Sequence, residues 1–291
     1  MNLLLQTPLA LGRRVLRRES PLAGRTVLVT GASSGIGEAT AYAVAERGAR
    51  VLLVARRAEE PDRVRARIGE AAWTYPCDLT DGDAVDALVK EVLAEHGAVD
   101  YLVNNAGRSI RRSLALSYDR FHDVERSMAI NFLGPVRLTL GLLPAMREQR
   151  FGHVVNIVTW GVQVKAPKFS AYIASKSALD AWSRIAGRET FFENVTFTNM
   201  RFSLVQTPMT APTEAYAGRG ATAEQAAAKV VRALEDRPIT VGTLAGSFGE
   251  VINVVAPRAS DALLATLDRV FADSAAARDG RGSTDRAADR H

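Results

Sequence analysis

The chain has 291 residues, of which 47% are hydrophobic and 24% charged, and its formal net charge is +5. A chain of this size and composition can bury a large core. The single cysteine, Cys77, excludes an internal disulfide and a cysteine metal cluster, and it fits a reducing cytoplasm. Because no apolar run approaches the roughly 20 residues that a membrane-spanning helix needs, we expect a cytoplasmic protein with no metal.

The positive charge is concentrated at the N-terminus. Residues 1–25 carry five arginines against the single acid Glu19. We interpret residues 1–23 as a basic amphipathic arm that either contacts a membrane peripherally or packs as a strap on the domain. A basic balance also suits nucleic acid or a polyanionic substrate. No nucleic-acid-binding motif accompanies it, so we expect no nucleic-acid partner, and the other two alternatives stay open.

Short β-branched runs alternate with longer helical patterns from Arg25 onward. The predicted strands are 26–30, 50–55, 72–76, 99–105, 152–159 and 195–202, with a final short strand in "ITVGT". The main predicted helices are 35–48, 81–96, 119–149 and 170–192. This alternation predicts an α/β fold: one Rossmann-type domain with a doubly wound parallel sheet of about seven strands and helices on both faces.

The pattern changes after Thr207, and this change sets the expected boundaries. Residues 24–245 form the predicted Rossmann domain, in which 207–220 is a loop suited to act as a lid. A helix follows, since Thr222 and Gln225 have capping-box spacing. We expect a helical extension over 246–275. The small, charged and aperiodic residues 276–291 predict a disordered tail.

The stretch "TGASSGIG", residues 30–37, lies between the first strand and the first helix. Gly31 allows a tight turn, Gly35 lets the backbone approach a pyrophosphate, and Gly37 lets helix and strand pack closely. The helix N-terminus then directs unpaired N–H groups at the phosphates. The context therefore predicts a dinucleotide site, to which the turn also contributes Ser33, Ser34 and Ile36.

The end of the second predicted strand favours NADP(H) over NAD(H). An NAD site usually places an acidic side chain here, on the ribose 2′-hydroxyl. This sequence has Arg56 and Arg57 instead, with no acid before Glu59. A guanidinium pairs with a 2′-phosphate that a carboxylate would repel.

Several motifs in order resemble the short-chain dehydrogenase/reductase family over roughly residues 24–210. They are "TGASSGIG", "CDLTD", "NNAG" at 104–107, "AINFLG" and "YIASK" at 172–176. The resemblance implies that Asn131 holds a water in a proton relay. It also implies that helices 119–149 and 170–192 form the contacts of a homodimer or homotetramer. The cofactor contacts that it implies come from Asp78, Leu79, Asn105, Ala106, Gly107, Val205 and Thr207.

Tyr172 and Lys176 stand at i and i+4, so on a helix they share a face. A nearby ammonium and the nicotinamide charge would lower the pKa of the tyrosine, which could then exchange a proton with a carbonyl oxygen. We expect both residues to contact the cofactor, with Lys176 holding the nicotinamide ribose. Thirteen positions before the tyrosine, where the family usually has serine, stands Thr159, which keeps the hydroxyl and adds a methyl. A second departure is Phe202-Ser203 in place of Pro-Gly.

The variable segments, among them "NNAGRSIRRSLALSYDRFHDVERSM" and "LVQTPMTAPT", resemble the long-chain fatty acyl-CoA reductases that form fatty aldehydes. The resemblance implies a lipid substrate. One or more of Arg108, Arg111 and Arg112 could contact CoA phosphates, or the three form a solvated basic loop. One alternative is an NADP(H)-dependent ketone or aldehyde oxidoreductase acting on a 3-oxoacyl, steroid or other carbonyl. Another is a cofactor-binding scaffold of low activity, because the fold alone does not fix the reaction.

Overall fold

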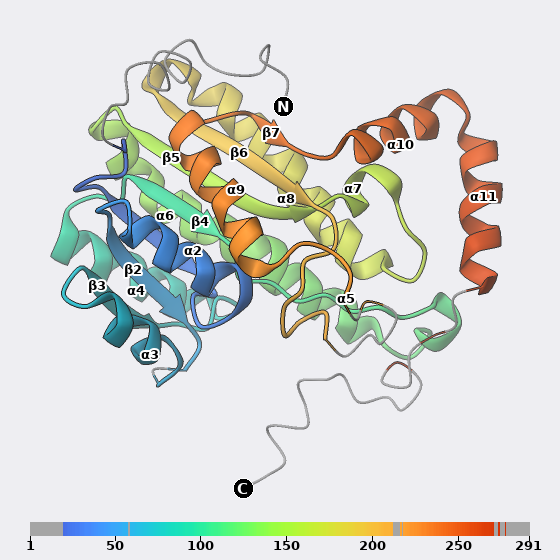
Figure 1. Ribbon diagram of the computed structural model, residues 1–291, viewed down its shortest axis with the longest axis horizontal. Helices are drawn as coiled ribbons and strands as arrows, with labels where there is room; N and C mark the ends of the chain where they lie inside the picture. Colours follow the sequence, from blue (N-terminus) through green and yellow to red (C-terminus); the bar gives the residue numbers. More distant parts are fainter. Residues whose placement is uncertain are drawn as a thin grey trace, which may run out of the picture.

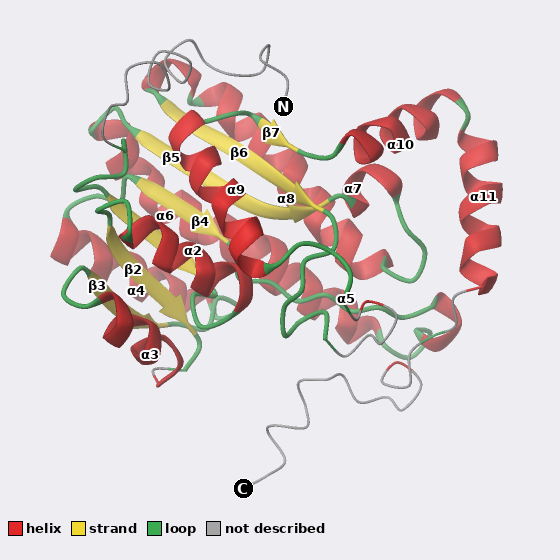
Figure 2. Ribbon diagram, in the orientation of Figure 1, coloured by secondary structure: helices red, strands yellow, loops and turns green. Residues whose placement is uncertain are grey.

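The α/β prediction is confirmed by a computed structural model that describes residues 20–57, 59–211, 216, 218–270, 273 and 277. The sheet has seven parallel strands in the order β3-β2-β1-β4-β5-β6-β7, with helices on both faces (Figures 1 and 2). Most of the N-terminal arm (1–19), part of the predicted lid (212–215 and 217) and the tail from 278 lie outside the described residues.

Every strand predicted from the sequence is present. The central strands are buried over most of their length, as expected when helices cover both faces of a parallel sheet. The strand expected at 99–105 is limited to four residues, and the last strand has two. Their bounds are β1 Thr26–Thr30, β2 Arg50–Ala55, β3 Ala72–Pro76, β4 Tyr101–Asn104, β5 Gly152–Thr159, β6 Val195–Phe202 and β7 Thr240–Val241.

Ten α-helices are present in the described part of the chain. Helices α2 and α9 cover one face of the sheet, and α4, α6 and α8 cover the other, each with its own hydrophobic cluster. The bounds are α2 Gly35–Ala45, α3 Glu59–Ile68, α4 Gly82–His96, α5 Phe121–Met128, α6 Gly134–Glu148, α7 Gly161–Val164, α8 Ser170–Glu189, α9 Ala223–Asp236, α10 Leu244–Val255 and α11 Pro257–Val270.

The helix expected at 119–149 is divided by a π-helical turn, Ala129–Leu133, between α5 and α6. Contrary to the expectation from sequence, the continuous run Phe121–Glu148 is long and apolar enough, by length and composition, to cross a membrane. However, the α6 side chains Leu138, Leu142 and Met146 are buried against the sheet and α4. Core helices of soluble proteins pass the same test, so this run is weak evidence for a membrane span.

Beyond the sheet edge at β7, α10 and α11 form the C-terminal part of the described fold. Figure 1 shows α11 standing away from the sheet, at the far end of α10. Thr243 begins α10 by accepting a hydrogen bond from the backbone N–H of Gly246, at 3.0 Å. Many apolar side chains of this pair are exposed, among them Leu244, Phe248 and Leu263.

Candidate active site

A cleft of about 1770 Å³ lies at the carboxyl ends of the strands, where open parallel sheets bind ligands. Single-ligand sites usually measure about 300–1000 Å³, so this cleft has room for two large molecules side by side. Of the predicted site residues, Gly37 and Asn131 lie behind its surface. The others line it: Gly31, Ser33, Ser34, Gly35, Ile36, Arg56, Arg57, Asp78, Leu79, Asn105, Ala106, Gly107, Thr159, Tyr172, Lys176, Val205 and Thr207.

The glycine turn between β1 and α2 is as tight as its sequence predicts. Gly31 and Gly35 have φ of +64° and +56°, in the left-handed region that favours glycine. A Cβ on Gly37 would lie 2.1 Å from the carbonyl oxygen of Gly31, so helix and turn pack too closely for any side chain. The side chain of Ser34 makes no capping hydrogen bond, so the first turn of α2 keeps N–H donors for a ligand. These features fit a dinucleotide pyrophosphate.

The "NNAG" segment braces this turn from β4. Asn105 donates its side-chain amide to the carbonyl oxygens of Thr30 and Gly31, at 2.9 and 3.2 Å. The hydroxyl of Thr30 in turn accepts the backbone N–H groups of Asn105 and Ala106, both at 3.0 Å. The segment therefore fixes the backbone of the turn as well as lining the cleft.

At the end of β2, Arg56 and Arg57 are both exposed at the cleft. Arg57 forms an ion pair with Glu60. A third arginine at this rim, Arg63 of α3, was not predicted, although it also lines the cleft. It forms a two-pronged ion pair with Glu38 at 2.6 and 2.8 Å, which lowers the pKa of that carboxyl. Because 25 positions separate these two residues, local spacing could not reveal the pair.

Helix α8 presents Tyr172 and Lys176 to the cleft from the same face. The ammonium of Lys176 donates a hydrogen bond to the carbonyl oxygen of Ile157 in β5, at 2.8 Å, and only 3% of the residue is exposed. Burial lowers the pKa of Lys176 to about 8, because an apolar environment disfavours the charged form. The lysine is thus fixed in position before any ligand binds.

The π-helical turn points Asn131 inward, beside the lysine. Its amide donates to Ser175 Oγ at 3.1 Å and to the carbonyl oxygen of Arg108 at 2.9 Å, and its Oδ1 accepts the N–H of Arg108 at 3.0 Å. A Cβ on Gly107 would come within 2.7 Å of that Oδ1 and 3.2 Å of Lys176 Nζ. Glycine at 107 therefore allows Asn131 and the lysine to approach one another. Such π turns often occur at functional sites.

Thr159 ends β5 with its hydroxyl directed at Tyr172. The Oγ1 accepts the backbone N–H of Gly161 at 3.1 Å, and the hydroxyl also hydrogen-bonds Tyr172. Because the backbone N–H occupies an acceptor position, the hydroxyl proton stays available for donation. The added methyl causes no conflict with this geometry. A Cβ at position 161 would lie 3.3 Å from the methyl carbon of Thr159. Because this contact is tight, glycine is favoured at position 161.

The pKa of Tyr172 responds to burial, which the expectation from sequence did not include. Burial raises it to about 12, and the hydrogen bond from Thr159 opposes that shift. A phenol with a raised pKa is fully protonated at neutral pH. It is therefore ready to donate a proton, which is the role that carbonyl reduction requires.

The basic loop after β4 is divided between the cleft and the interior. Arg108 and Arg111 line the cleft. Arg112 does not, because its guanidinium is buried beside the Asp123 carboxylate of α5, at 3.5 Å. Its backbone N–H donates to the carbonyl oxygen of Lys168 at 2.7 Å. Of the three arginines considered as CoA contacts, Arg108 and Arg111 therefore remain candidates, while the side chain of Arg112 anchors the loop.

At Phe202-Ser203, β6 continues without the Pro-Gly that the resemblance leads one to expect. The backbone N–H of Trp160 donates to the carbonyl oxygen of Phe202 at 2.8 Å, so β5 and β6 stay paired to their ends. Val205 then forms a parallel bridge with Ala221. This path still brings Val205 and Thr207 to the cleft.

The part of the cleft away from the glycine turn carries charged side chains, such as Arg111 and Lys168, and apolar ones that sequence analysis missed. Its lining includes Phe169, Ile173 and Met209 and, from α11, Leu264 and Leu267. Sequence reasoning assigned the cover of the site to 207–220 alone, because nothing in the spacing of α11 indicates where it packs. Among the described residues, no group of three or more His, Cys, Asp or Glu side chains could hold a metal ion.

The comparisons with known proteins all point to the same family. A sequence profile described as short chain dehydrogenase matches residues 25–217. A fatty acyl-CoA reductase from Acinetobacter baylyi is 44% identical over 258 residues, which cover 87% of this chain and 88% of the relative. An uncharacterized oxidoreductase from Mycobacterium tuberculosis is 46% identical and covers 90% of this chain and 79% of its own length.

Solved structures agree with the sequence matches. A short-chain dehydrogenase from Streptomyces avermitilis is 30% identical with a TM-score of 0.73, covering 86% of this chain and 98% of its own. A 3-ketoacyl-(acyl-carrier-protein) reductase from Brucella melitensis, complexed with NADH, is 26% identical with a TM-score of 0.69, covering 74% and 93%. A metagenomic short-chain oxidoreductase in complex with NADP is 30% identical with a TM-score of 0.66, covering 76% and 97%.

Proposed function

Since the chain belongs to the short-chain dehydrogenase/reductase family and is an oxidoreductase, we propose that it reduces long-chain fatty acyl-CoA to fatty aldehyde with NADPH, releasing free CoA. The observation that carries the proposal is the 44% identity to fatty acyl-CoA reductases over 87 to 89% of this chain. The large cleft with its apolar side chains supports it, since the substrate is long and must lie beside the cofactor.

The cofactor half of the cleft would hold NADPH through the glycine turn and the rim arginines. The N-terminus of α2 would bind the pyrophosphate, and Arg56 and Arg57 would face the 2′-phosphate. Asp78 and Leu79 would lie against the adenine, and Val205 with Thr207 against the carboxamide. When bound, the nicotinamide supplies the hydride, and Lys176 would hold the ribose next to it.

The catalytic side chains then act on the thioester carbonyl. Hydroxyl groups of Thr159 and Tyr172 would donate hydrogen bonds to the carbonyl oxygen and stabilise the negative charge that develops there. The carbonyl carbon gains the hydride, its bond to sulfur breaks, and the CoA thiolate leaves and takes up a proton from solvent. Tyr172 would supply and recover the proton on oxygen through Lys176 and the buried Asn131.

The remaining polar groups near the cleft suit a CoA ester handled without a covalent intermediate. Arg108 and Arg111 line the cleft and would pair with CoA phosphates. Cys77 lies next to the proposed adenine site, and burial raises the pKa of its thiol to about 11. A protonated thiol is a weak nucleophile, so we propose no enzyme-bound thioester.

We also propose a homodimer or homotetramer in the cytoplasm. Apolar side chains are exposed on the segments expected at subunit contacts, among them Leu133, Leu140 and Ile185. Covering such residues is a usual reason for association. Light scattering on the full chain should give a mass of two or four subunits, and a monomer would contradict this proposal.

A second candidate function is the reduction of a ketone or aldehyde, such as a 3-oxoacyl group. It is favoured by the likeness to the 3-ketoacyl-(acyl-carrier-protein) reductase structure, in which the same fold serves that reaction. We would measure NADPH oxidation with palmitoyl-CoA, a fatty aldehyde and a 3-oxoacyl thioester side by side, and titrate free thiol in each. Thiol release with palmitoyl-CoA supports the main proposal. Oxidation of NADPH only with the 3-oxoacyl thioester, without thiol release, favours the second.

A further inference from the structure

Helix α11 turns one face toward the cleft and the other toward solvent. Leu264, Leu267 and Asp268 line the cleft, and Ser260, one turn before Leu264, is buried. These positions follow the three- and four-residue spacing of a single helical face. Leu263 stands one turn before Leu267, but it does not line the cleft and is 61% exposed. The helix therefore offers two leucines to the cleft and a neighbouring leucine that takes no part in it.

Two contacts attach α11 to the loops around the cleft. Lys168 Nζ forms an ion pair with Asp268 Oδ1 at 2.8 Å and donates a hydrogen bond to the backbone carbonyl oxygen of Asp268 at 3.0 Å. The side chain of Lys168 is almost buried, which strengthens this pairing. Beyond the helix, Asp273 accepts the backbone N–H of Ser113 at 3.1 Å. The C-terminal half of α11 is thus fixed against the basic loop and the segment that precedes α8.

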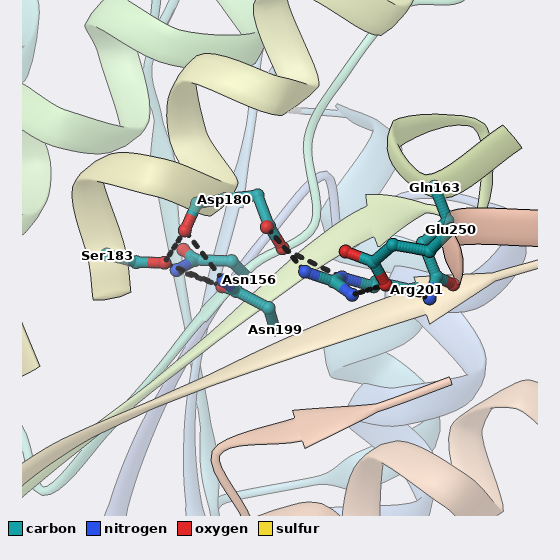
Figure 3. A network of polar contacts seen from close by, with 7 residues as sticks. All are labelled: Asn156, Gln163, Asp180, Ser183, Asn199, Arg201 and Glu250. Carbon is teal, nitrogen blue, oxygen red and sulfur yellow. Dashed lines mark hydrogen bonds and ion pairs between the residues drawn. The ribbon is translucent and has the colours of Figure 1, made fainter. Parts of the chain in front are cut away.

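The base of the helical pair is attached to the catalytic elements through Arg201 of β6, as Figure 3 shows. Its guanidinium binds Asp180 of α8 at 2.8 and 3.1 Å, and Glu250 of α10 at 3.2 Å. Glu250 also accepts the amide of Gln163 in α7, at 2.8 Å. The guanidinium of Arg201 therefore joins α8, which carries Tyr172, to α10, which precedes α11.

Apolar side chains line the cleft both beside Tyr172 and on α11. The rings of Tyr172 and Phe169 lie with centroids 6.3 Å apart, and Phe169 directly follows Lys168, the residue bound to α11. On α11, Leu267 is 45% exposed although it lines the cleft. Apolar surface of this kind gains free energy when an alkyl chain covers it.

We infer that α11 is the far wall of the acyl-chain site, and that Leu264 and Leu267 select the chain length that the enzyme accepts. The inference rests on the proposed function, because it takes the acyl chain of a CoA ester as the ligand. The carbonyl carbon must lie at Tyr172, so a longer chain extends farther toward α11. Short chains end before the wall, whereas long chains contact it.

The test is a binding series that does not depend on turnover. Calorimetry in the presence of NADP⁺ would give the Kd of saturated acyl-CoAs from C8 to C18 for the wild type, Leu267→Trp and the matched control Leu263→Trp. We expect Leu267→Trp to weaken binding of the C16 and C18 esters by about 10-fold or more, since hydrophobic pockets discriminate by roughly this factor per methylene. The C8 ester should bind as to the wild type.

Three outcomes would overturn the inference: equal weakening at every length, no weakening at any length, or the same change in Leu263→Trp. Leu267→Ala serves as the second variant, because removing a half-exposed side chain spares the core; it should weaken C16 and C18 binding while leaving C8 unchanged. Failure of the proposed function is a separate result. In that case the wild type binds acyl-CoA with the same length dependence but releases no thiol.

Discussion

The two halves of the cleft are built in different ways. The phosphate-binding part of the cofactor half comes from one short piece of chain: a strand, a glycine turn and the first turn of a helix, all within residues 26–45. The substrate half is assembled from segments far apart in the sequence. Lys168 meets Asp268 across 100 positions, and Ser113 meets Asp273 across 160.

This difference separates what the family shares from what this chain adds. Steric limits at Gly31 and Gly37 fix the turn whatever the substrate is. The substrate half depends instead on where a C-terminal helix packs, and a few surface contacts decide that. We therefore expect substitutions in the cofactor half to change cofactor binding, those in the substrate half to change chain-length preference, and those between them to change the chemical step.

The largest effect should follow Tyr172→Phe, at the boundary of the two halves. The change removes the proton donor and keeps the ring beside Phe169. Because positioned acids contribute about 10²–10⁴-fold, we expect kcat to fall by about 10³-fold. NADPH affinity, measured by fluorescence titration, should change little. A large loss of that affinity would mean that Tyr172 belongs to the cofactor half.

Thr159→Val should lower kcat/KM by about 10²-fold or more, since it removes one donor to the developing oxyanion and keeps the shape. Thr159→Ser is the matched control and should retain most of the activity, because the hydroxyl that bonds Tyr172 remains. Steady-state kinetics of both variants would decide the point. An equal kcat/KM for Thr159→Val and the wild type would show that the hydroxyl has no catalytic role.

The next largest effect should be a loss of stability at low pH, caused by His153 at the edge of the sheet opposite the cleft. His153 of β5 is fully buried between the hydroxyls of Thr196 and Thr198, and burial lowers its pKa to about 3. In the unfolded chain its pKa is about 6.5, so the unfolded state binds more protons between these values. Its contribution to stability is thus complete above pH 6.5 and is lost as pH falls toward 3.

Because the unfolded chain takes up a proton on His153 and the folded chain does not, the free energy of unfolding should fall by about 2 kcal/mol from pH 7 to pH 5. Urea unfolding of wild type and His153→Gln at both pH values would measure it. The variant should lose correspondingly less stability on acidification. An identical loss in both proteins would mean that His153 does not control the acid response.

The smallest effect should come from the cofactor rim. Arg56→Ala should lower the preference for NADPH over NADH by about 10-fold, since a hydrogen bond to a charged group contributes about 1.5–3 kcal/mol. The matched control is Arg65→Ala, an exposed arginine on α3 that does not line the cleft. Kinetics with both cofactors would separate the two variants. An unchanged preference in Arg56→Ala would move the 2′-phosphate contact to Arg57 or Arg63.

The parts of the molecule that the sequence predicts well are those set by local rules. Strand positions followed from runs of β-branched residues, and the turn followed from glycines whose spacing the backbone enforces. The break at Ala129–Leu133 was not predictable, because the residues on both sides of it favour helix. The burial of Arg112 was not predictable either, because it depends on how α5 packs and so on where Asp123 lies.

The pKa of Tyr172 shows the same limit at the site itself. Spacing placed the tyrosine and lysine together, but the direction of the shift depends on how deeply the phenol is buried. Burial is a property of the whole cleft, including Ile173 and the segments that cover it. Sequence therefore placed Tyr172 and Lys176 together at the cleft and could not give the protonation of the phenol.

The most direct test of the proposed reaction is the ratio of free thiol released to NADPH oxidised when the wild type acts on palmitoyl-CoA. Reduction to the aldehyde consumes one NADPH for each CoA released, so the expected ratio is about one, with fatty aldehyde as the product. NADPH oxidation without thiol release, or none at all with palmitoyl-CoA, would contradict the proposed acyl-CoA reduction.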